Sequence, residues 1–420
     1  MDNIRNRKLR EIDIAKQVTW NTVGSFVLML AQWGISVILV RMAGFSEAGI
    51  FSLAMSVSNI FTYFGNYSTR NYMTSDECGE YTYRQYIYTR VITVAAGVGL
   101  CLLFLLFAGY NFQTSTAIFL YILYAGQTMI SDILYGCMQR CNHLEIGGIG
   151  STVKGVFCFL AFMIVMAISS DLLLSMAVMA FVAWGVMIFY ELPVFRMLLG
   201  KIGLISAEEL RAIPKLLRTC FPLMLSLVLP MITVAAPRIV IERILGEELL
   251  GIYSSIYTPT VAITTFVPAV ITGVVPMYAA AWVKNDFTRF KKLTLVTVFS
   301  VLGIGALACL VSFFFGKPVL TFLFGKEIEP YFFLLYFAIL ATTANAMTHC
   351  GLVLLTVQRQ IRHTLFSTIV AMLLVCVGAY PFVILYGIYG AAYILAIGYS
   401  VQVVWQLIAI YIKLRKSKVN

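Results

Sequence analysis

The chain has 420 residues, of which 60% are hydrophobic and 12% are charged, and its formal net charge is +11. A soluble domain carries about 25% charged residues, so this composition excludes an ordinary water-facing surface. Runs of about 18 or more apolar residues recur along the chain, and each is long enough to cross a hydrocarbon core of about 30 Å. We therefore expect an all-α polytopic membrane protein.

Apolar runs bounded by charges or turn residues predict twelve transmembrane helices. They lie near residues 19–40, 46–68, 87–108, 116–137, 149–170, 172–192, 219–241, 250–275, 293–315, 331–356, 364–385 and 388–412. The first run has no small-residue cleavage site behind it, so it is expected to be a retained helix rather than a signal peptide.

Lysine and arginine residues are concentrated in every second connection between the predicted helices. If residue 1 is cytoplasmic, the cytoplasmic connections hold Arg5, Arg7, Lys8, Arg10, Lys16, Arg70, Arg84, Arg140, Arg196, Lys201, Arg211, Lys215, Arg218, Lys284, Arg289, Lys291, Lys292, Arg359, Arg362, Lys413, Arg415, Lys416 and Lys418. The opposite connections hold Arg41, Arg243, Lys317 and Lys326. This bias predicts that both termini are cytoplasmic. The basic charge is thus a sign of membrane topology, and no nucleic-acid partner is expected.

The chain contains an internal repeat. The stretch R-M-A-G-F-S-E-A-G-I-F-S, from Arg41 to Ser52, is echoed by R-I-L-G-E-E-L-L-G-I-Y-S, from Arg243 to Ser254. A chance recurrence of glycine turns is the alternative, but the shared positions keep one constant offset and follow the first and the seventh helix. Two parallel six-helix repeats are therefore predicted, with an N-terminal bundle at 1–192 and a C-terminal bundle at 219–420.

The connection at 193–218 joins the two predicted bundles. Ser206 and Glu209 have the spacing of a helix capping box, and the following basic, amphipathic stretch suggests a helix lying among lipid head groups. Pro214 is expected to bend or shorten it. We interpret the connection as a cytoplasmic interfacial linker, and an ordinary basic loop is the alternative.

No catalytic signature stands out. The sequence has no Walker loop, no H-E-x-x-H and no G-x-S-x-G. The three histidines, His143, His349 and His363, are scattered over distant helices. No enzyme, cofactor or metal site is therefore expected.

Few ionisable residues fall within the predicted helices, and such residues usually face a cavity or a partner. Apart from Glu47 at the start of the second helix, they are Arg90, Asp132, Lys154, Glu191 and Arg238. Arg90 and Glu191 are expected to reach the inner head groups, and Asp132 and Lys154 either neutralise each other or serve a cavity.

Two polar stripes accompany these charges. Asn59, Asn66 and Arg70 share one helical face, and Asn345, Thr348 and His349 share another. Such stripes line water or a ligand, or form hydrogen bonds between helices.

Three segments together resemble the polysaccharide biosynthesis family of O-antigen and capsule repeat-unit flippases. They are W-N-T-V-G-S from Trp20, L-V-R-M-A-G-F-S-E-A-G-I-F-S around Arg41, and N-Y-S-T-R-N-Y-M-T-S-D from Asn66. The resemblance covers residues 15–95 and, through the repeat, 219–295. It implies a fold like that of the multidrug and toxin extruders (MATE-like), in the bacterial cytoplasmic membrane.

The resemblance also implies a function. The substrate would be an undecaprenyl-diphosphate-linked oligosaccharide, moved from the inner to the outer leaflet by alternating access between the bundles. A polysaccharide polymerase and an initiating glycosyltransferase are the implied partners, besides membrane lipids. The implied cations for the diphosphate or cavity are Arg70, Arg90, Lys154 and Arg238, the implied sugar contacts are Asn66, Asn345 and His349, and Asp132 is the ion-coupling candidate.

Two other functions are alternatives. A multidrug or cation antiporter of the same superfamily commonly has an acidic residue in its first, seventh or eighth helix. Here the first and eighth helices have none, and Glu242 lies at the outer end of the seventh. A membrane glycan polymerase or transferase would usually carry a long outward catalytic loop, which this sequence lacks.

Overall fold

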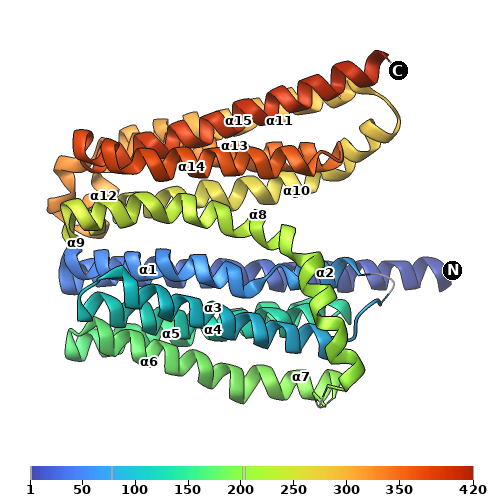
Figure 1. Cartoon of the computed structure of the whole chain (residues 1–420), viewed down its shortest axis with the longest axis horizontal. Helices are drawn as coiled ribbons and strands as arrows, with labels where there is room; N and C mark the ends of the chain where they lie inside the picture. The colour runs from blue at the N-terminus through green and yellow to red at the C-terminus, as the bar shows by residue number, and fades with distance from the viewer. Residues whose placement is uncertain (1, 77–78, 201, 204, 420) are drawn as a thin grey trace. The chain divides into compact units, whose positions relative to one another are not determined.

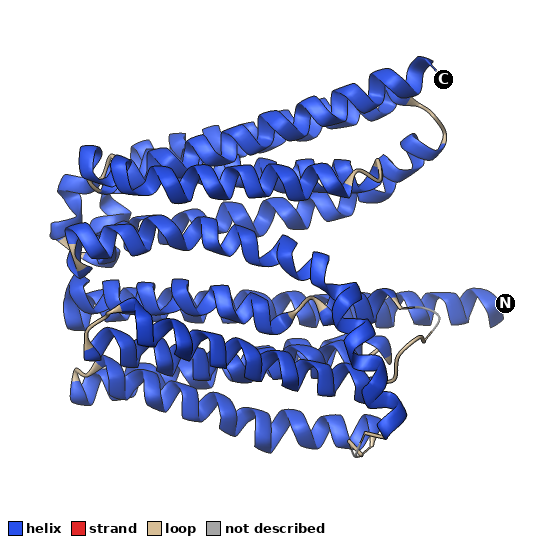
Figure 2. Cartoon of the chain, viewed as in Figure 1, coloured by secondary structure: helices blue, strands red, loops and turns tan. Residues whose placement is uncertain are grey.

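A computed structural model describes residues 2–76, 79–200, 202–203 and 205–419 of the chain. All regular structure in this part is helical (Figure 2). Ten of the described helices are long and apolar enough to cross a membrane. The chain is therefore an all-α, multi-pass membrane protein, as the sequence predicts.

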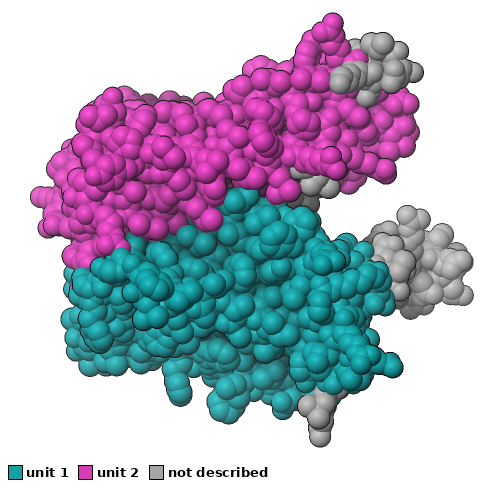
Figure 3. Space-filling view, in the orientation of Figure 1, with its two compact units in different colours: residues 1–43, 53–231 teal, residues 44–52, 232–420 magenta. Residues whose placement is uncertain are grey.

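The chain forms two compact units (Figure 3), and unit 1 comprises residues 1–43 and 53–231. Its helices are α1 (Asp2–Asn66), α2 (Thr69–Ser75), α3 (Tyr83–Ala108), α4 (Phe112–Arg140), α5 (Leu144–Ser169), α6 (Leu172–Val186), the π-helical turn η1 (Met187–Glu191), α7 (Leu192–Leu199) and the first part of α8 (Ala207–Leu245). Helix α4 lies at the centre of the unit, in contact with α2, α3, α5, α6 and α7 (Figure 1).

Unit 2 comprises residues 44–52 and 232–420. After the rest of α8 it contains α9 (Glu247–Tyr257), η2 (Thr258–Thr260), α10 (Val261–Val283), α11 (Phe287–Val311), η3 (Ser312–Gly316), α12 (Lys317–Phe324), η4 (Lys326–Tyr331), α13 (Leu334–Val357), α14 (Ile361–Tyr386) and α15 (Ile388–Val419). Helix α13 contacts α9, α10, α11, α14 and α15, and so takes the central place that α4 has in unit 1.

All twelve expected spans coincide with helices. The first two are joined in α1, where Gly44 (φ 87°, ψ −179°) interrupts the helical backbone. The eighth is divided into α9, η2 and α10. In both α4 and α13, which are the fourth and the tenth span, 67% of the most apolar stretch is buried inside the protein. No other described span reaches that share, so the matching helices of the two repeats are equally central.

The repeated segments have the same backbone and pack on each other. Gly246 (φ 90°) matches Gly44 (φ 87°), a conformation that favours glycine because a Cβ would clash there. A Cβ on Gly49 would lie 1.9 Å from the Glu247 oxygen, and a Cβ on Gly251 would lie 1.9 Å from the Phe45 oxygen. The hydroxyls of Ser52 and Ser254 are 2.5 Å apart. These reciprocal contacts have the pattern of a local two-fold axis within unit 2, which supports a true duplication.

The linker is continuous with the seventh span. The expected capping box is present, because the Ser206 N–H donates to Glu209 Oε2 (3.0 Å) and the Glu209 N–H donates to Ser206 Oγ (3.2 Å). Helix α8 then runs through Pro214 to Leu245, and the division between the units falls within it, after Met231. The basic stretch is thus helical and continuous with the seventh span, and its first part is bent away from the rest of α8 (Figure 1). Its position among lipid head groups stays a prediction.

The close approach of the repeats makes a prediction about stability. Gly49→Val and Gly251→Val should each lower the thermal stability of the purified protein in detergent, by about 1–3 kcal/mol for overpacking. Gly303→Ala is the matched control, because a Cβ there meets nothing within 4 Å. Equal melting temperatures for all three variants would contradict the packing described here.

Candidate functional site

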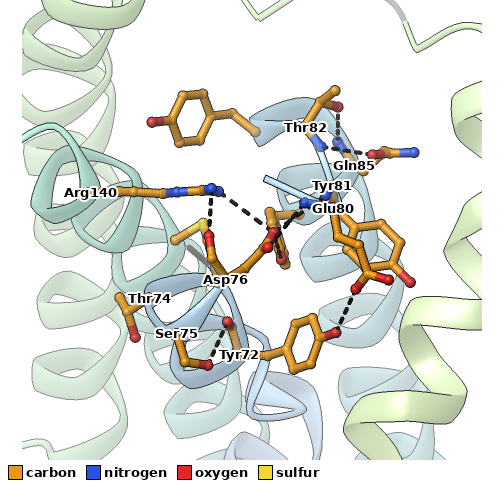
Figure 4. Close-up of polar contacts among 12 residues, drawn as sticks. Tyr72, Thr74, Ser75, Asp76, Glu80, Tyr81, Thr82, Gln85 and Arg140 are labelled. Carbon is orange, nitrogen blue, oxygen red and sulfur yellow. Dashed lines mark hydrogen bonds and ion pairs between the residues drawn. The ribbon is translucent and has the colours of Figure 1, made fainter. Parts of the chain in front are cut away.

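Helix α2 carries the first candidate cation, Arg70, and is tied to α4 at its C-terminal end. The Arg140 guanidinium donates to the Asp76 carbonyl oxygen (2.8 Å) and lies 3.9 Å from the Asp76 carboxylate. The two side chains point toward one another in Figure 4. Arg140 ends α4 and Asp76 caps α2, so this pair holds the short helix against the central one.

Asp76 also organises the turn before α3. Its carboxylate accepts hydrogen bonds from the Glu80 N–H (3.0 Å), the Tyr81 N–H (3.3 Å) and the Tyr86 hydroxyl (3.0 Å). Burial by itself would raise the pKa of Asp76, but these hydrogen bonds and Arg140 outweigh it and hold that pKa below its usual value. Ionised Asp76 is therefore part of what fixes α2 in place.

Asp132, at the centre of unit 1, is shared by two arginines. Arg70 Nη1 donates to Asp132 Oδ1 (2.7 Å), and Arg90 Nη2 donates to Asp132 Oδ2 (3.1 Å). Arg70 Nη2 also donates to Gln139 Oε1 (3.0 Å), and Arg90 Nη1 donates to Asn66 Oδ1. We call these five side chains the Asp132 network. It joins α1, α2, α3 and α4.

Glycines allow the helices to come close enough for this network. A Cβ on Gly136 of α4 would meet Met73 Cε at 2.6 Å and Arg70 Cγ at 2.9 Å. A Cβ on Gly97 of α3 would meet the Phe61 carbonyl oxygen of α1 at 2.9 Å. Because glycine has no side chain, Gly136 leaves room for the Arg70 side chain over α4. In the same way, Gly97 allows α3 to pack closely against α1.

The Asp132 network carries a surplus of positive charge, because two guanidinium groups face one carboxylate. The Arg90 side chain is 1% exposed, whereas the Arg70 side chain is 27% exposed. Arg70 can therefore meet a ligand directly. Asp132, which is 29% exposed, fixes the orientation of Arg70 by accepting from it, and the buried Arg90 holds Asp132 in turn.

Lys154 and Glu191 lie in a second polar cluster of unit 1. The Glu191 carboxylate accepts hydrogen bonds from Ser131 Oγ and from the Tyr135 hydroxyl (2.5 Å). Lys154 Nζ donates to Thr128 Oγ1 (3.4 Å). The cluster brings together α4, α5 and the π-helical turn that ends at Glu191.

One sequence-based interpretation is wrong, and one of the two alternatives for Asp132 is excluded. Arg90 and Glu191 were expected to extend to the inner head groups, but each is 1% exposed and hydrogen-bonded inside the unit. The ion pairs of Asp132 are made with Arg70 and Arg90 rather than with Lys154. A buried guanidinium group has lost its hydration, and a nearby carboxylate offsets that cost.

The other three candidate residues belong to unit 2. Arg238 of α8 is half-buried and lies near the buried Tyr253 and Tyr399 and the half-buried Tyr257. Asn345 is half-buried on α13, and the exposed His349 follows one turn later. They remain candidate contacts for a substrate.

Three residues of the two clusters were not predicted as site residues from the sequence. Ser131, Tyr135 and Gln139 were not singled out, although Thr128, Ser131, Asp132, Tyr135 and Gln139 recur at spacings of three and four along α4. That spacing puts them on one face and was the available signal. No group of three or more His, Cys, Asp or Glu side chains in the described part of the chain is arranged to hold a metal ion.

Removing the shared carboxylate tests the Asp132 network. Asp132→Asn should lower stability by about 1.5–3 kcal/mol, because two guanidinium groups lose a charged acceptor. The double variant Arg90→Met/Asp132→Asn should lose less than the sum of its single variants. Thermal unfolding in lipid nanodiscs measures both, with the exposed Glu248→Gln as control. Strict additivity would argue against a direct Arg90–Asp132 interaction.

Asp76 gives a prediction about pH. Its folded-state pKa is lowered from the unfolded value of about 3.9, so its contribution to stability is present above that pH and is lost as the pH falls through the folded-state value. Wild type should therefore lose more stability than Asp76→Asn between pH 5 and the acid limit of the folded protein. Parallel pH profiles for the two proteins would contradict this role.

Comparison with known proteins relates this fold to transport proteins. The capsular polysaccharide biosynthesis protein CapF of Staphylococcus aureus is 24% identical over 330 residues, which cover 75% of this chain and 78% of the relative. An inward-facing multidrug resistance MATE family transporter superposes with a TM-score of 0.76 at 13% identity, covering 96% of this chain and 99% of the other. The lipid II flippase MurJ superposes with a TM-score of 0.74 at 13% identity, covering 96% and 90%.

These structures share the MATE-like fold with the chain, as the sequence predicted. The family model described as polysaccharide biosynthesis protein matches residues 14–282, which include all of the Asp132 network, Lys154 and Glu191. Because that match covers more than half of the chain, this protein belongs to the polysaccharide biosynthesis protein family.

Proposed function

We propose that this protein is a flippase for undecaprenyl-diphosphate-linked oligosaccharide repeat units. It would move them from the inner to the outer leaflet of the bacterial cytoplasmic membrane by alternating access, for O-antigen, capsule or exopolysaccharide synthesis. The single observation that carries the proposal is the surplus positive charge of the Asp132 network, in which the Arg70 guanidinium is partly exposed.

The chemistry of the diphosphate matches this network. A planar guanidinium makes charge-assisted, often bidentate hydrogen bonds to phosphate oxygens. Asp132 and Gln139 accept from Arg70 and so restrict its rotation before a ligand arrives. A pre-oriented cation loses less entropy on binding. We assign the first diphosphate contact to Arg70, with Arg90 as the buried support of its counter-ion.

The sugars of the substrate would bind to polar side chains, whereas its polyprenyl chain would stay in the lipid. We assign sugar contacts to Asn66, Asn345 and His349, and a further cation in the transport path to Arg238. Arg238 lies near three tyrosines, whose rings offer apolar faces with polar edges to a sugar.

The distribution of basic residues supports an orientation with both termini in the cytoplasm. In that orientation Arg70 lies at the cytoplasmic end of its helices, on the side where a lipid-linked repeat unit is assembled. A transporter in this position would receive its substrate from an initiating glycosyltransferase and deliver it to a polymerase. The surplus of positive charge favours such an anionic substrate over the organic cations that a multidrug exporter moves.

Translocation in proteoliposomes tests the proposal. The substrate is a fluorescent undecaprenyl-diphosphate oligosaccharide, and its exposure to an external glycosidase is followed with time. Arg70→Ala should slow exposure by about tenfold to a hundredfold, the equivalent of about 1.5–3 kcal/mol for a lost charge-assisted hydrogen bond. Arg70→Lys should recover part of the rate that Arg70→Ala loses, because lysine restores the positive charge but not the planar, bidentate guanidinium.

Arg211→Ala is the matched control, because it removes an exposed arginine outside the Asp132 network. It should retain the wild-type rate. Equal rates for Arg70→Ala and Arg211→Ala would remove Arg70 from the path. Efflux of an organic cation, without exposure of any lipid-linked glycan by the wild type, would favour the multidrug exporter.

A further inference from the structure

Glu191 is a carboxylate that the diphosphate site does not use. It is 1% exposed, and it is the last residue of a π-helical turn, Met187–Glu191, between α6 and α7. Single π-helical turns are rare and are frequent at functional sites. A carboxylate within a membrane segment is costly and normally marks a pathway for an ion, a proton or a substrate.

The neighbours of Glu191 are suited to a carboxyl group that changes its protonation state. Ser131 Oγ and the Tyr135 hydroxyl donate to its two oxygens. Both hydroxyls also have lone pairs, so they can accept from a protonated carboxyl group after rotating. Gln127 Nε2 donates to Ser131 Oγ (2.6 Å) and extends this chain of hydrogen bonds along α4.

Lys154 supplies the charge opposite Glu191. Its side chain is 2% exposed, and it interacts electrostatically with Glu191 and with Asp132. The two groups make no ion pair within 4.0 Å in the described structure, and Lys154 donates to Thr128 instead. A buried pair without direct contact gains less from mutual attraction than a contact pair, while each group still bears the cost of leaving water.

We propose that Glu191 is a proton-binding site and that proton binding there strengthens anion binding at the Asp132 network. A proton from water forms an O–H bond with one carboxylate oxygen, and no electrons are exchanged. The Glu191–Lys154 pair then changes from zero net charge to one positive charge. Ser131 and Asp132 are consecutive residues of α4, so this new charge arises next to the diphosphate site.

A proton fits this site better than a metal cation. A bound Na⁺ would meet the buried ammonium of Lys154 at short range, and like charges in a poorly solvated interior repel strongly. Asp132 is less suited to the role, because each of its oxygens already accepts a hydrogen bond from a guanidinium group.

Several other titratable groups surround Glu191. Tyr135 comes from α4, Lys154 and Cys158 come from α5, and Tyr190 precedes Glu191 on its own turn. Asp132 acts on Lys154 from α4. Tyr135 donates a hydrogen bond to the carboxylate and Lys154 places a positive charge opposite it, and both interactions favour the anion over the neutral acid.

Infrared titration of the purified protein in lipid tests the proton site without any substrate. Wild type should develop the stretching band of a buried protonated carboxyl group on acidification. Glu191→Gln should lack this band, whereas Glu208→Gln, at an exposed position, should keep it. In Lys154→Met and Tyr135→Phe the band should persist to higher pH. A band that survives in Glu191→Gln, or that is unmoved in both other variants, would overturn the assignment.

Binding of undecaprenyl diphosphate in nanodiscs tests the coupling, which rests on the proposed function. Glu191→Gln mimics the protonated state, so at neutral pH it should bind about tenfold more tightly than wild type, within the usual range of coupling between two sites. Its affinity should also vary less with pH than that of Glu208→Gln. Equal affinities at all pH values would disprove the coupling. If wild type bound no undecaprenyl diphosphate while the infrared result held, the proposed substrate would be wrong and the proton site would stand.

Discussion

The shared carboxylate of Asp132 is the interaction on which the interior of unit 1 depends. A guanidinium that is 1% exposed within a membrane protein needs a negative partner, and Arg90 finds it in Asp132. The same carboxylate orients Arg70. One acidic residue therefore allows two cations to be held inside a bundle of otherwise apolar helices. It also leaves one positive charge uncompensated, which is the property that an anionic headgroup would use.

Helix α4 makes this arrangement possible. It is the central and most buried helix of unit 1, and one of its faces carries Thr128, Ser131, Asp132, Tyr135 and Gln139. A polar face on a central helix contacts other helices rather than lipid, so its hydrogen bonds are made within the protein. Gly136 on the same helix leaves the space that Arg70 occupies. Charge, hydrogen bonding and close packing thus converge on a single helix.

The duplication has a different physical basis. The residues that kept their identity in both copies include Gly44 and Gly246, whose positive φ excludes most side chains, and Gly49 and Gly251, which face a backbone oxygen too closely for any Cβ. Each constraint acts on the backbone, and neither tolerates substitution. The Asp132 network depends instead on contacts between side chains, and all five of its members lie in unit 1.

The sequence by itself determined the membrane class, the twelve spans, the capping box at Ser206 and the repeat. Each of these depends on local hydrophobicity, turn chemistry or backbone geometry, which are readable along the chain. It also identified Arg90, Asp132, Lys154, Glu191 and Arg238 as the unusual charges, because ionisable residues in apolar helices are rare. Their partners were decided by the tertiary structure. Asp132 was free to pair with Lys154 on the next helix or with arginines on two others, and periodicity cannot rank these choices. Helix α2 packs over Gly136, and this packing brings Arg70 rather than Lys154 to the carboxylate of Asp132.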